Sequence, residues 1–359
     1  MKKNKLKSMR EYAEMNKKYK ADNKLAASDF FPAVVAYFAS YVLGLVSLHY
    51  LGIFHYTTII MMVLCIAFTG KLFVIQHDCG HGSYFETKKQ NNIVGTMLSF
   101  VTYIPYKAWK ITHSFHHRMA EILELTSIGS IKTLTVDEFR SLSISKKIIH
   151  MMFRNVFVLL VFGGVYYLFV LARFSMIKKT DLHILGESVA AREWKRFKEA
   201  KADKRKTNII LIIINLIGWY FFGVEFLLFQ FVILSIYMAF AIWFFYVQHQ
   251  FEEAHKVKTR NDWDHASVAL LGSSYYVLPA LVNYFTGNIG YHHIHHLFLT
   301  VPSYKLKKAH DDYKEHYESI VYMVNFRKSL SLAWCSLFDY QEKKMISFSE
   351  FFRREKARI

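Results

Sequence analysis

The chain is poor in cysteine and shows none of the cysteine patterns of small stabilised folds. Only three occur in 359 residues, Cys65, Cys79 and Cys335. An odd number without pair spacing implies no disulfide framework, which suits a reducing compartment. The lack of Cys-x2-Cys pairs also argues against structural zinc and iron–sulfur clusters.

Acidic residues are scarce as well. The chain has 46 Lys and Arg against 28 Asp and Glu, a formal net charge of +18. The basic clusters lie beside apolar blocks, so anionic lipid headgroups are favoured over nucleic acid as their partner. Residues 1–23 are basic and polar and lack the apolar core of a signal peptide.

Long apolar blocks are abundant. Hydrophobic residues make up 53% of the chain, and the mean hydropathy is +0.14. Blocks 30–54 and 56–76 flank a short turn that begins at Gly52, and blocks 208–223 and 225–247 flank a minimal turn. Each block is long enough to span a bilayer, so we predict four transmembrane helices in two hairpins. Lys71, near the end of the second block, is expected to extend toward the membrane surface.

Two further apolar blocks are expected to enter the membrane without crossing it. Block 92–106 is short and ends at Pro105, as an interfacial or re-entrant segment does. Block 152–174 is interrupted by Gly163 and Gly164 and is followed by segment 173–206 with eleven Lys and Arg. Because basic flanks stay in the cytoplasm, we favour a re-entrant element bent at these glycines over a crossing.

Eighteen histidines occur, and eight of them form three boxes. The boxes read H-x3-H, H-x2-H-H and H-x2-H-H, spacings that place side chains on one face of a helix. They comprise His77 and His81, then His113, His116 and His117, then His292, His295 and His296. His249, directly after the fourth span, is the candidate ninth ligand. This set exceeds the four ligands of a closed zinc site and implies two metal ions.

The third box holds one histidine more than the pattern needs. At about 100° per residue, His292, His295 and His296 lie within one arc of a helix, and His293 lies at about 100°, outside it. We therefore predict that His293 points toward protein or solvent and binds no metal. Four side chains near the boxes are candidates for orienting the imidazoles: Asp78, Glu252, Glu253 and Asn288.

Five stretches of this sequence carry a resemblance to a known family. They are His77-Asp-Cys-Gly-His81-Gly-Ser83, His113-Ser-Phe-His116-His117, Phe245-Tyr-Val-Gln-His249-Gln-Phe-Glu252, Gly272-Ser-Ser-Tyr-Tyr276 and Phe285-Thr-Gly-Asn-Ile-Gly-Tyr-His292-His-Ile-His295-His296-Leu297. They resemble the membrane fatty acid desaturases, most closely the bacterial acyl-lipid branch, over about residues 30–340.

The resemblance implies an enzyme that activates O2 and removes two hydrogens from an acyl chain of a membrane phospholipid, leaving a cis double bond. It implies that the eight box histidines are catalytic and that they and His249 bind two Fe ions on the cytoplasmic face. It further implies that a small electron-transfer protein, ferredoxin or flavodoxin, supplies the electrons.

The residues themselves agree with this chemistry. Methylene C–H bonds are too strong for acid–base attack, and imidazole ligands suit iron and leave positions open for O2. A hydroxylase or ketolase that acts on an alkane, sterol or carotenoid is the alternative with the same boxes. A metal transporter is disfavoured, because transport needs ionisable residues within the spans, whereas these boxes lie at or beyond the membrane ends.

The expected fold is an all-α integral membrane protein with four transmembrane helices and two re-entrant or interfacial segments. A cytoplasmic helical cap carries the di-iron site. We expect three parts: a cytoplasmic N-terminal segment 1–29, a membrane-embedded domain 30–340 and a basic C-terminal tail 341–359. The expected location is the cell membrane, with the active site facing the cytoplasm.

Overall fold

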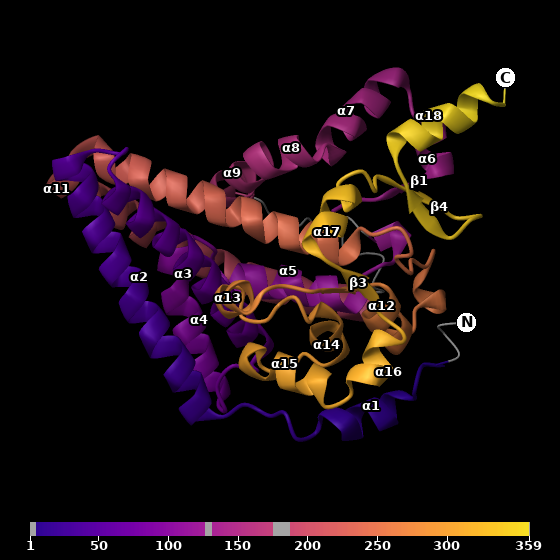
Figure 1. Ribbon diagram of the computed structural model, residues 1–359, viewed down its shortest axis with the longest axis horizontal. Coiled ribbons are helices and arrows are strands. Elements are labelled where there is room, and N and C mark those ends of the chain that lie inside the picture. Colours follow the sequence, from indigo (N-terminus) through magenta and orange to yellow (C-terminus); the bar gives the residue numbers. More distant parts are fainter. Residues whose placement is uncertain (1–4, 126–130, 175–186, 359) are drawn as a thin grey trace.

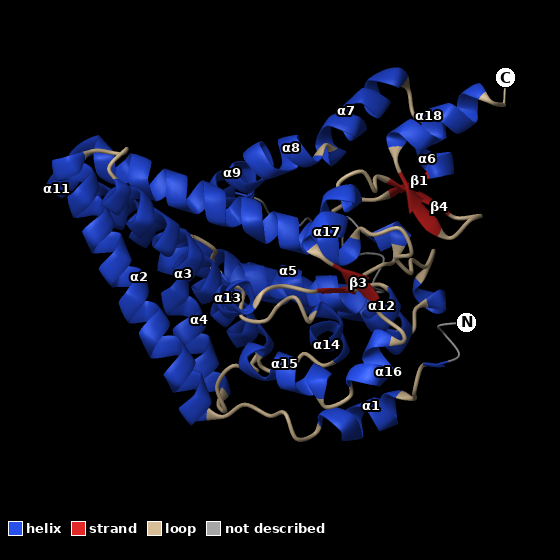
Figure 2. Cartoon of the chain, viewed as in Figure 1, coloured by secondary structure: helices blue, strands red, loops and turns tan. Residues whose placement is uncertain are grey.

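The computed structural model describes residues 5–125, 131–174 and 187–358, and most of them are helical (Figures 1 and 2). Long helices extend from one end of the molecule, and shorter helices with small sheets form a cap at the other end (Figure 1). Both predicted hairpins are present. Their turns lie side by side at the end away from the cap, where His49 Nδ1 is 2.8 Å from Glu225 Oε2.

The first hairpin consists of α2 (Asn23–Leu51) and α3 (Tyr56–His81). Asp22 caps α2 by accepting hydrogen bonds from backbone N–H groups of its first turn, and His55 caps α3 in the same way. Gly52 ends α2 with φ 83°, a conformation that glycine adopts without steric cost. The predicted turn is confirmed, and α3 extends far enough to carry the whole first histidine box.

The prediction for Lys71 is wrong. Its side chain does not extend to the membrane surface but is 4% exposed, with Nζ 2.7 Å from Asp29 Oδ1. The hydroxyl of Tyr84 donates to the other carboxylate oxygen of Asp29 at 2.8 Å. A buried ammonium is stable only beside such a partner. Because Asp29 lies on α2, the sequence around Lys71 could not predict this pairing.

The second hairpin is formed by the two arms of α11 (Glu187–His249). The arms meet at Gly223, whose φ of 60° and ψ of −151° lie outside the helical region and are accessible to glycine. The predicted turn is confirmed. The first arm is longer than the predicted block 208–223, because the charged residues before position 208 continue the same helix.

Two short helices follow the first hairpin. The first is α4 (Lys88–Thr102), which packs along α3, and the second is α5 (Tyr106–Met119), which begins directly after Pro105. Gln76 on α3 donates from Nε2 to the backbone oxygens of Gly95 and Ile104 at 3.1 and 3.0 Å. The apolar block before Pro105 is thus largely helical, and its interfacial or re-entrant place in the membrane remains a prediction.

Residues 156–174 form one continuous helical run rather than a bent element. The run consists of α8 (Val156–Val158), the π-helix η3 (Leu159–Gly163), α9 (Gly164–Tyr166), the π-helix η4 (Tyr167–Leu171) and α10 (Ala172–Phe174). Gly163 and Gly164 both have helical dihedral angles, so the predicted bend is wrong. The glycines serve packing: a Cβ at Gly164 would lie 3.1 Å from the Met238 side chain on α11.

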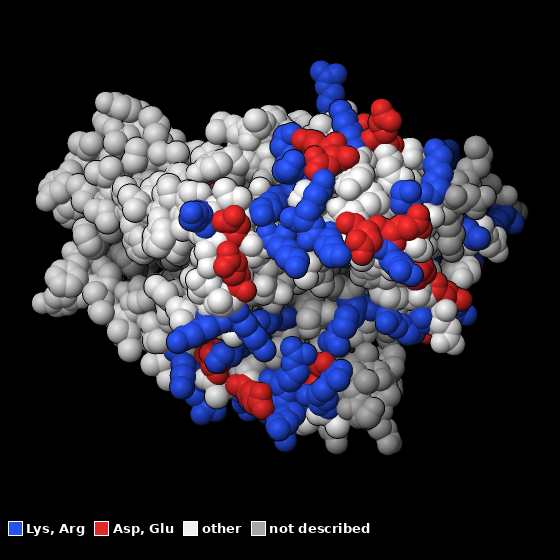
Figure 3. Space-filling model, turned by 90° about the horizontal axis from the view of Figure 1, so that it is seen from below, with Lys and Arg blue, Asp and Glu red and all other residues white. Residues whose placement is uncertain are grey.

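Four helices of the described chain are long and apolar enough to cross a membrane. They are Asn23–Leu51, Tyr56–His81, Val156–Phe174 and Ala190–His249, the last of which contains both arms of α11. Lys and Arg gather away from the hairpin turns on the face seen from below (Figure 3). The molecule thus has an apolar end and a charged end.

The cap consists of short elements. Its helices are α1 (Met9–Asn16), α6 (Val136–Ser141), α7 (Ile144–Arg154), α12 (His265–Leu271), α13 (Ala280–Phe285), α14 (His292–Leu297), α15 (Ser303–Asp311), α16 (Lys314–Glu318), α17 (Phe326–Leu332) and α18 (Phe348–Lys356), with 3-10 turns η2 (Leu123–Leu125) and η6 (Arg260–Asp262). One sheet has the order β1 (Leu134–Thr135), β4 (Leu337–Asp339), β5 (Lys344–Ile346), and another pairs β2 (Ser274–Tyr276) with β3 (Tyr322–Val324). The all-α prediction missed these strands, because two or three residues show no alternating pattern.

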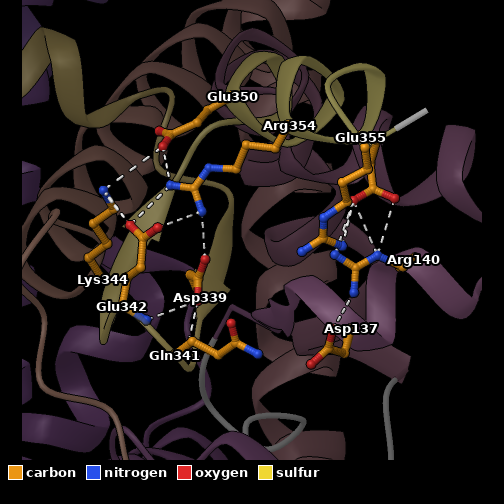
Figure 4. A network of polar contacts seen from close by, with 10 residues as sticks. Asp137, Arg140, Asp339, Gln341, Glu342, Lys344, Glu350, Arg354 and Glu355 are labelled. Carbon is orange, nitrogen blue, oxygen red and sulfur yellow. Dashed lines mark hydrogen bonds and ion pairs between the residues drawn. The ribbon is translucent and has the colours of Figure 1, made fainter.

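Ion pairs hold the C-terminal part of the chain on the cap (Figure 4). Arg354 on α18 lies 2.7 Å from Asp339 and 3.0 Å from Glu342, and Arg140 on α6 lies 3.1 Å from Glu355. These pairs are partly exposed and screened by solvent, so each contributes little to stability. Residues 341–359, expected as a basic tail, thus include β5 and α18.

Candidate metal centre

Four helices bring the histidine boxes to one place at the inner end of the long helices. The first box occupies the last turn of α3, which ends at Gly82 with φ 74°. The second box lies on α5 and the third on α14, and His249 is the last residue of α11. The two hairpins return to the same end of the molecule, so their final turns meet the two short helices there.

All nine predicted ligands fall into two groups. Cluster 1 contains His77, His81, His113, His117 and His295, and cluster 2 contains His116, His249, His292 and His296. Within each cluster, every histidine offers a ring nitrogen within 4.8 Å of those of the others. Sequence reasoning found every member, but it did not predict how the second and third boxes divide between the clusters.

The nitrogen separations fit the coordination of metal ions. His117 Nε2 lies 2.9 Å from His113 Nε2 and 3.1 Å from His295 Nε2 in cluster 1. In cluster 2, His292 Nε2 lies 2.9 Å from His249 Nε2 and 3.0 Å from His296 Nε2. Adjacent imidazoles at about 2.1 Å from one ion are about 3 Å apart. In addition, Nε2 of His81 is buried without a hydrogen-bond partner, as expected of a ligand atom.

Burial keeps the histidines of α5 and α14 neutral. It lowers the pKa of His113, His117 and His295 well below the usual value, and neighbouring histidines lower it further. The same causes act on the pKa of His292 and His296. Neutral imidazole is the form that binds a metal ion, so the site needs no deprotonation step near neutral pH.

One of the four candidates for orienting the imidazoles is in place. Asp78 Oδ1 lies 3.0 Å from His77 Nδ1, and Asp78 Oδ2 accepts a hydrogen bond from the Ser303 backbone N–H at 2.6 Å. Glu252 instead bonds to the Tyr322 hydroxyl, Glu253 is exposed, and Asn288 donates to the backbone oxygen of Ser303 at 3.1 Å. Asp78 lies on α3, the same helix as the histidine that it supports.

Sequence reasoning missed Glu121, which lies four residues after His117. Its Oε1 is 3.0 Å from His249 Nδ1, and its Oε2 is bonded to Lys256 Nζ. Burial acts to raise the pKa of Glu121, but Lys256 and His249 outweigh this and hold the pKa below its usual value. An acidic residue shortly after a histidine box is a weak signal, and nothing local connects it with His249.

His293 lies outside both clusters, as predicted. The third box is helical, and His293 Nε2 lies 3.1 Å from His310 Nδ1, with Tyr275 and Tyr317 beside it. It points into protein, because its exposed fraction is 0%. His310 is buried with it. Of the other histidines outside the boxes, His183 lies outside the described residues.

Aromatic rings border the clusters. Trp109 stacks on His113 with ring centroids 4.5 Å apart, and Phe245 lies 5.0 Å from His116 and 5.2 Å from His249. A Cβ at Gly80 would lie 2.9 Å from the Trp109 ring, so this glycine leaves room for the indole. One aromatic ring thus packs against histidines of each cluster, Trp109 at cluster 1 and Phe245 at cluster 2.

This fold and site define a class: helical, multi-pass membrane proteins with clustered histidines where the spans meet a cap. The chain belongs to the fatty acid desaturase family, whose model matches residues 52–327. It is 33% identical over 301 residues to the fatty acid desaturase of Bacillus subtilis (strain 168). The matched region covers 83% of this chain and 79% of that relative.

Two cyanobacterial relatives are more distant. The sn-1 acyl-lipid omega-3 desaturase (ferredoxin) of Nostoc sp. (strain 36) is 28% identical, over 75% of this chain and 69% of its own. The sn-1 oleoyl-lipid 12-desaturase of Synechocystis sp. (strain ATCC 27184 / PCC 6803 / Kazusa) is 25% identical, over 83% of this chain and 81% of its own. The chain is thus an oxidoreductase that desaturates fatty acyl chains, and desaturation is supported over hydroxylation or ketone formation.

Proposed function

We propose that the protein introduces a cis double bond into acyl chains of membrane phospholipids, with O2 as co-substrate and two iron ions held by clusters 1 and 2. The observation that carries this proposal is the division of nine histidines, seven of them buried and two partly buried, into groups of five and four. Each group offers enough nitrogens for one ion, and imidazole leaves iron with positions open to O2.

Iron with O2 supplies the oxidant that breaks two C–H bonds. The acyl chain gives up two hydrogens with their two electrons. Two more electrons from a carrier and two protons from water complete the reduction of O2 to two waters. The protein binds and orients the reactants. Asp78 and Glu121 fix the rings of His77 and His249, and the rings of Trp109 and Phe245 exclude water from the clusters.

The relatives guide the choice of substrate and electron donor. Two of them are named for sn-1 acyl lipids, and one name specifies ferredoxin. We extend both to this chain: the substrate is an acyl chain esterified in a membrane lipid, and the donor is a ferredoxin or flavodoxin. An apolar body with a charged cap suits a lipid substrate that stays in the bilayer.

We further propose that the cap faces the cytoplasm and that 156–174 does not cross the membrane. Arg173, near the end of this run, donates to Asn208 Oδ1 at 2.7 Å and to the backbone oxygen of Tyr103. Asn208 precedes Gly223 by 15 residues, or about 22 Å of helix, so the run ends well short of the hairpin turns.

Product analysis tests the reaction. The chain is expressed in a host that lacks polyunsaturated lipids, and new double bonds are located by mass spectrometry of intact lipids and released fatty acids. We expect new double bonds in lipid-bound chains and about two irons per chain, with His296→Ala as the inactive control. Hydroxylated products, or full activity with zinc alone, would contradict the proposal.

Cysteine labelling from outside intact cells tests the topology. Lys195 is exposed on the first arm of α11, and Phe54 is 92% exposed in the first hairpin turn. A membrane-impermeant reagent should label Phe54→Cys and leave Lys195→Cys unlabelled until the cells are opened. Labelling of Lys195→Cys in intact cells would contradict the proposed topology.

A further inference from the structure

A buried ion pair outside the histidine boxes holds one imidazole of cluster 2. Glu121 Oε1 lies 3.0 Å from His249 Nδ1, and Lys256 Nζ bonds to Glu121 Oε2 and lies 3.3 Å from the backbone oxygen of His249. The side chains of all three residues are only 2–4% exposed. Two charges so deeply buried are costly to desolvate, so the pair is a weak source of stability in itself.

The backbone is shaped to bring Glu121 to this position. Ile122 and Val257 form an isolated parallel β-bridge, in which the Val257 N–H donates to Glu121 O and the Leu123 N–H donates to Val257 O, both at 2.9 Å. Glu121 itself has φ 65°. This left-handed conformation is energetically unfavourable for any residue other than glycine. The bridge ties the chain after the second box to the chain after His249.

A glycine makes room for the carboxylate. A Cβ at Gly272 would lie 2.7 Å from Glu121 Cγ and 2.6 Å from the backbone oxygen of Val268. Its φ is −95°, so conformational freedom is not the reason for a glycine here. The close approach of Glu121 and of the α12 backbone accounts for it.

The contact with Glu121 fixes how His249 faces the cluster. A carboxylate accepts a hydrogen bond, so Nδ1 of His249 carries the proton and Nε2 presents its lone pair. That Nε2 lies 2.9 Å from His292 Nε2, inside cluster 2. The ring thus spans from the ion pair to the candidate metal position.

We propose that Glu121 and Lys256 are a positioning pair for the metal ion of cluster 2, in which Glu121 sets the tautomer and orientation of His249 and Lys256 holds Glu121 in place. This inference rests on the proposed function, because it takes cluster 2 to bind iron. It assigns a role to two residues outside the histidine boxes and ties that role to one of the two ions.

A double-mutant cycle separates positioning from simple stabilisation. Glu121→Met and Lys256→Met each leave one buried charge unpaired and should lower the melting temperature, whereas the double variant removes both charges and should recover most of it. Glu124→Gln is the matched control, because Glu124 is an exposed carboxylate in the same segment. Iron is measured per chain under chelator competition, with 57Fe Mössbauer spectra of the purified protein.

If the pair positions His249, iron affinity at cluster 2 falls about 10- to 100-fold in both Glu121→Met and the double variant. Iron per chain then falls toward one under competition, and one spectral component is lost while the other is unchanged. Glu121→Gln keeps an acceptor oxygen and should recover part of the affinity. Glu124→Gln should match the wild type in every measurement.

Two results would overturn the inference. The first is a double variant that regains stability and keeps both irons with wild-type spectra, since the pair would then be only a structural salt bridge. The second is equal loss of both spectral components in a folded double variant. A wild-type protein that binds fewer than two irons would instead contradict the proposed function. That result is independent of the Glu121 and Lys256 variants.

Discussion

Cluster 1 and cluster 2 both take histidines from α5 and α14. The two helices divide their histidines between the clusters in opposite proportions. On α5, His113 and His117 join cluster 1 and His116 joins cluster 2. Residues four apart lie on one face of a helix, so the outer pair stays together, with Nε2 atoms 2.9 Å apart. The residue between them faces the second cluster.

On α14 the proportions are reversed. His292 and His296 join cluster 2, and His295 joins cluster 1. The pair four residues apart again stays together, with Nε2 atoms 3.0 Å apart. Two boxes of identical spacing therefore supply both sites, and each short helix lies between the two clusters.

The clusters differ in their third helix and in how it is supported. Cluster 1 is completed by α3, where Asp78 follows its partner His77 directly in the chain. Cluster 2 is completed by α11, where His249 depends on Glu121, a residue far away in the sequence. Support from within a box can be recognised in a sequence, whereas support that depends on chain pairing cannot.

The largest expected effect comes from removing one ligand of either cluster. His292→Ala and His295→Ala should each abolish desaturation, because the proposed reaction needs an iron in each cluster. Each variant should keep about one iron per chain under chelator competition, since the other cluster is intact. The measurements are product formation, iron content and 57Fe Mössbauer spectra.

The division between clusters predicts that these two variants differ in which iron remains. His292→Ala should keep the spectral component of cluster 1, and His295→Ala should keep that of cluster 2. The same remaining component in both variants would show that the third box supplies a single site. The division of its histidines between the two clusters would then be wrong.

A smaller effect is expected from Asp78→Asn. The amide still accepts one hydrogen bond, but it cannot serve both His77 and the Ser303 N–H as the carboxylate does. We expect iron affinity to fall about tenfold, in cluster 1 only. Chelator titration followed by Mössbauer spectroscopy measures this, and loss from cluster 2 would contradict the pairing of Asp78 with cluster 1.

Sequence reasoning succeeded where the signal is local. The turn at Gly52 and the break between blocks 208–223 and 225–247 marked the two hairpins. Histidine spacing identified eight members of the clusters, because helix geometry repeats over a few residues, and the position of His249 directly after the fourth span identified the ninth. It failed where distant segments meet. Lys71 gained a buried partner from α2, Glu121 reached His249 through a β-bridge, and Gly164 proved to serve helix packing rather than bending.

The smallest effect on catalysis is expected from His293→Ala, one residue away from the predicted ligand His292. His293 belongs to neither cluster and pairs with His310 at 3.1 Å, so its loss should leave two irons per chain and most of the activity. The cost falls on folding, because a buried ring is removed and His310 loses its partner. We expect a loss of about 2–3 kcal/mol in unfolding free energy. Thermal melts and iron content of His293→Ala and His292→Ala, measured side by side, check this. A folded His293→Ala protein with about one iron would mean that α14 presents a different set of histidines to the metals than the one found here.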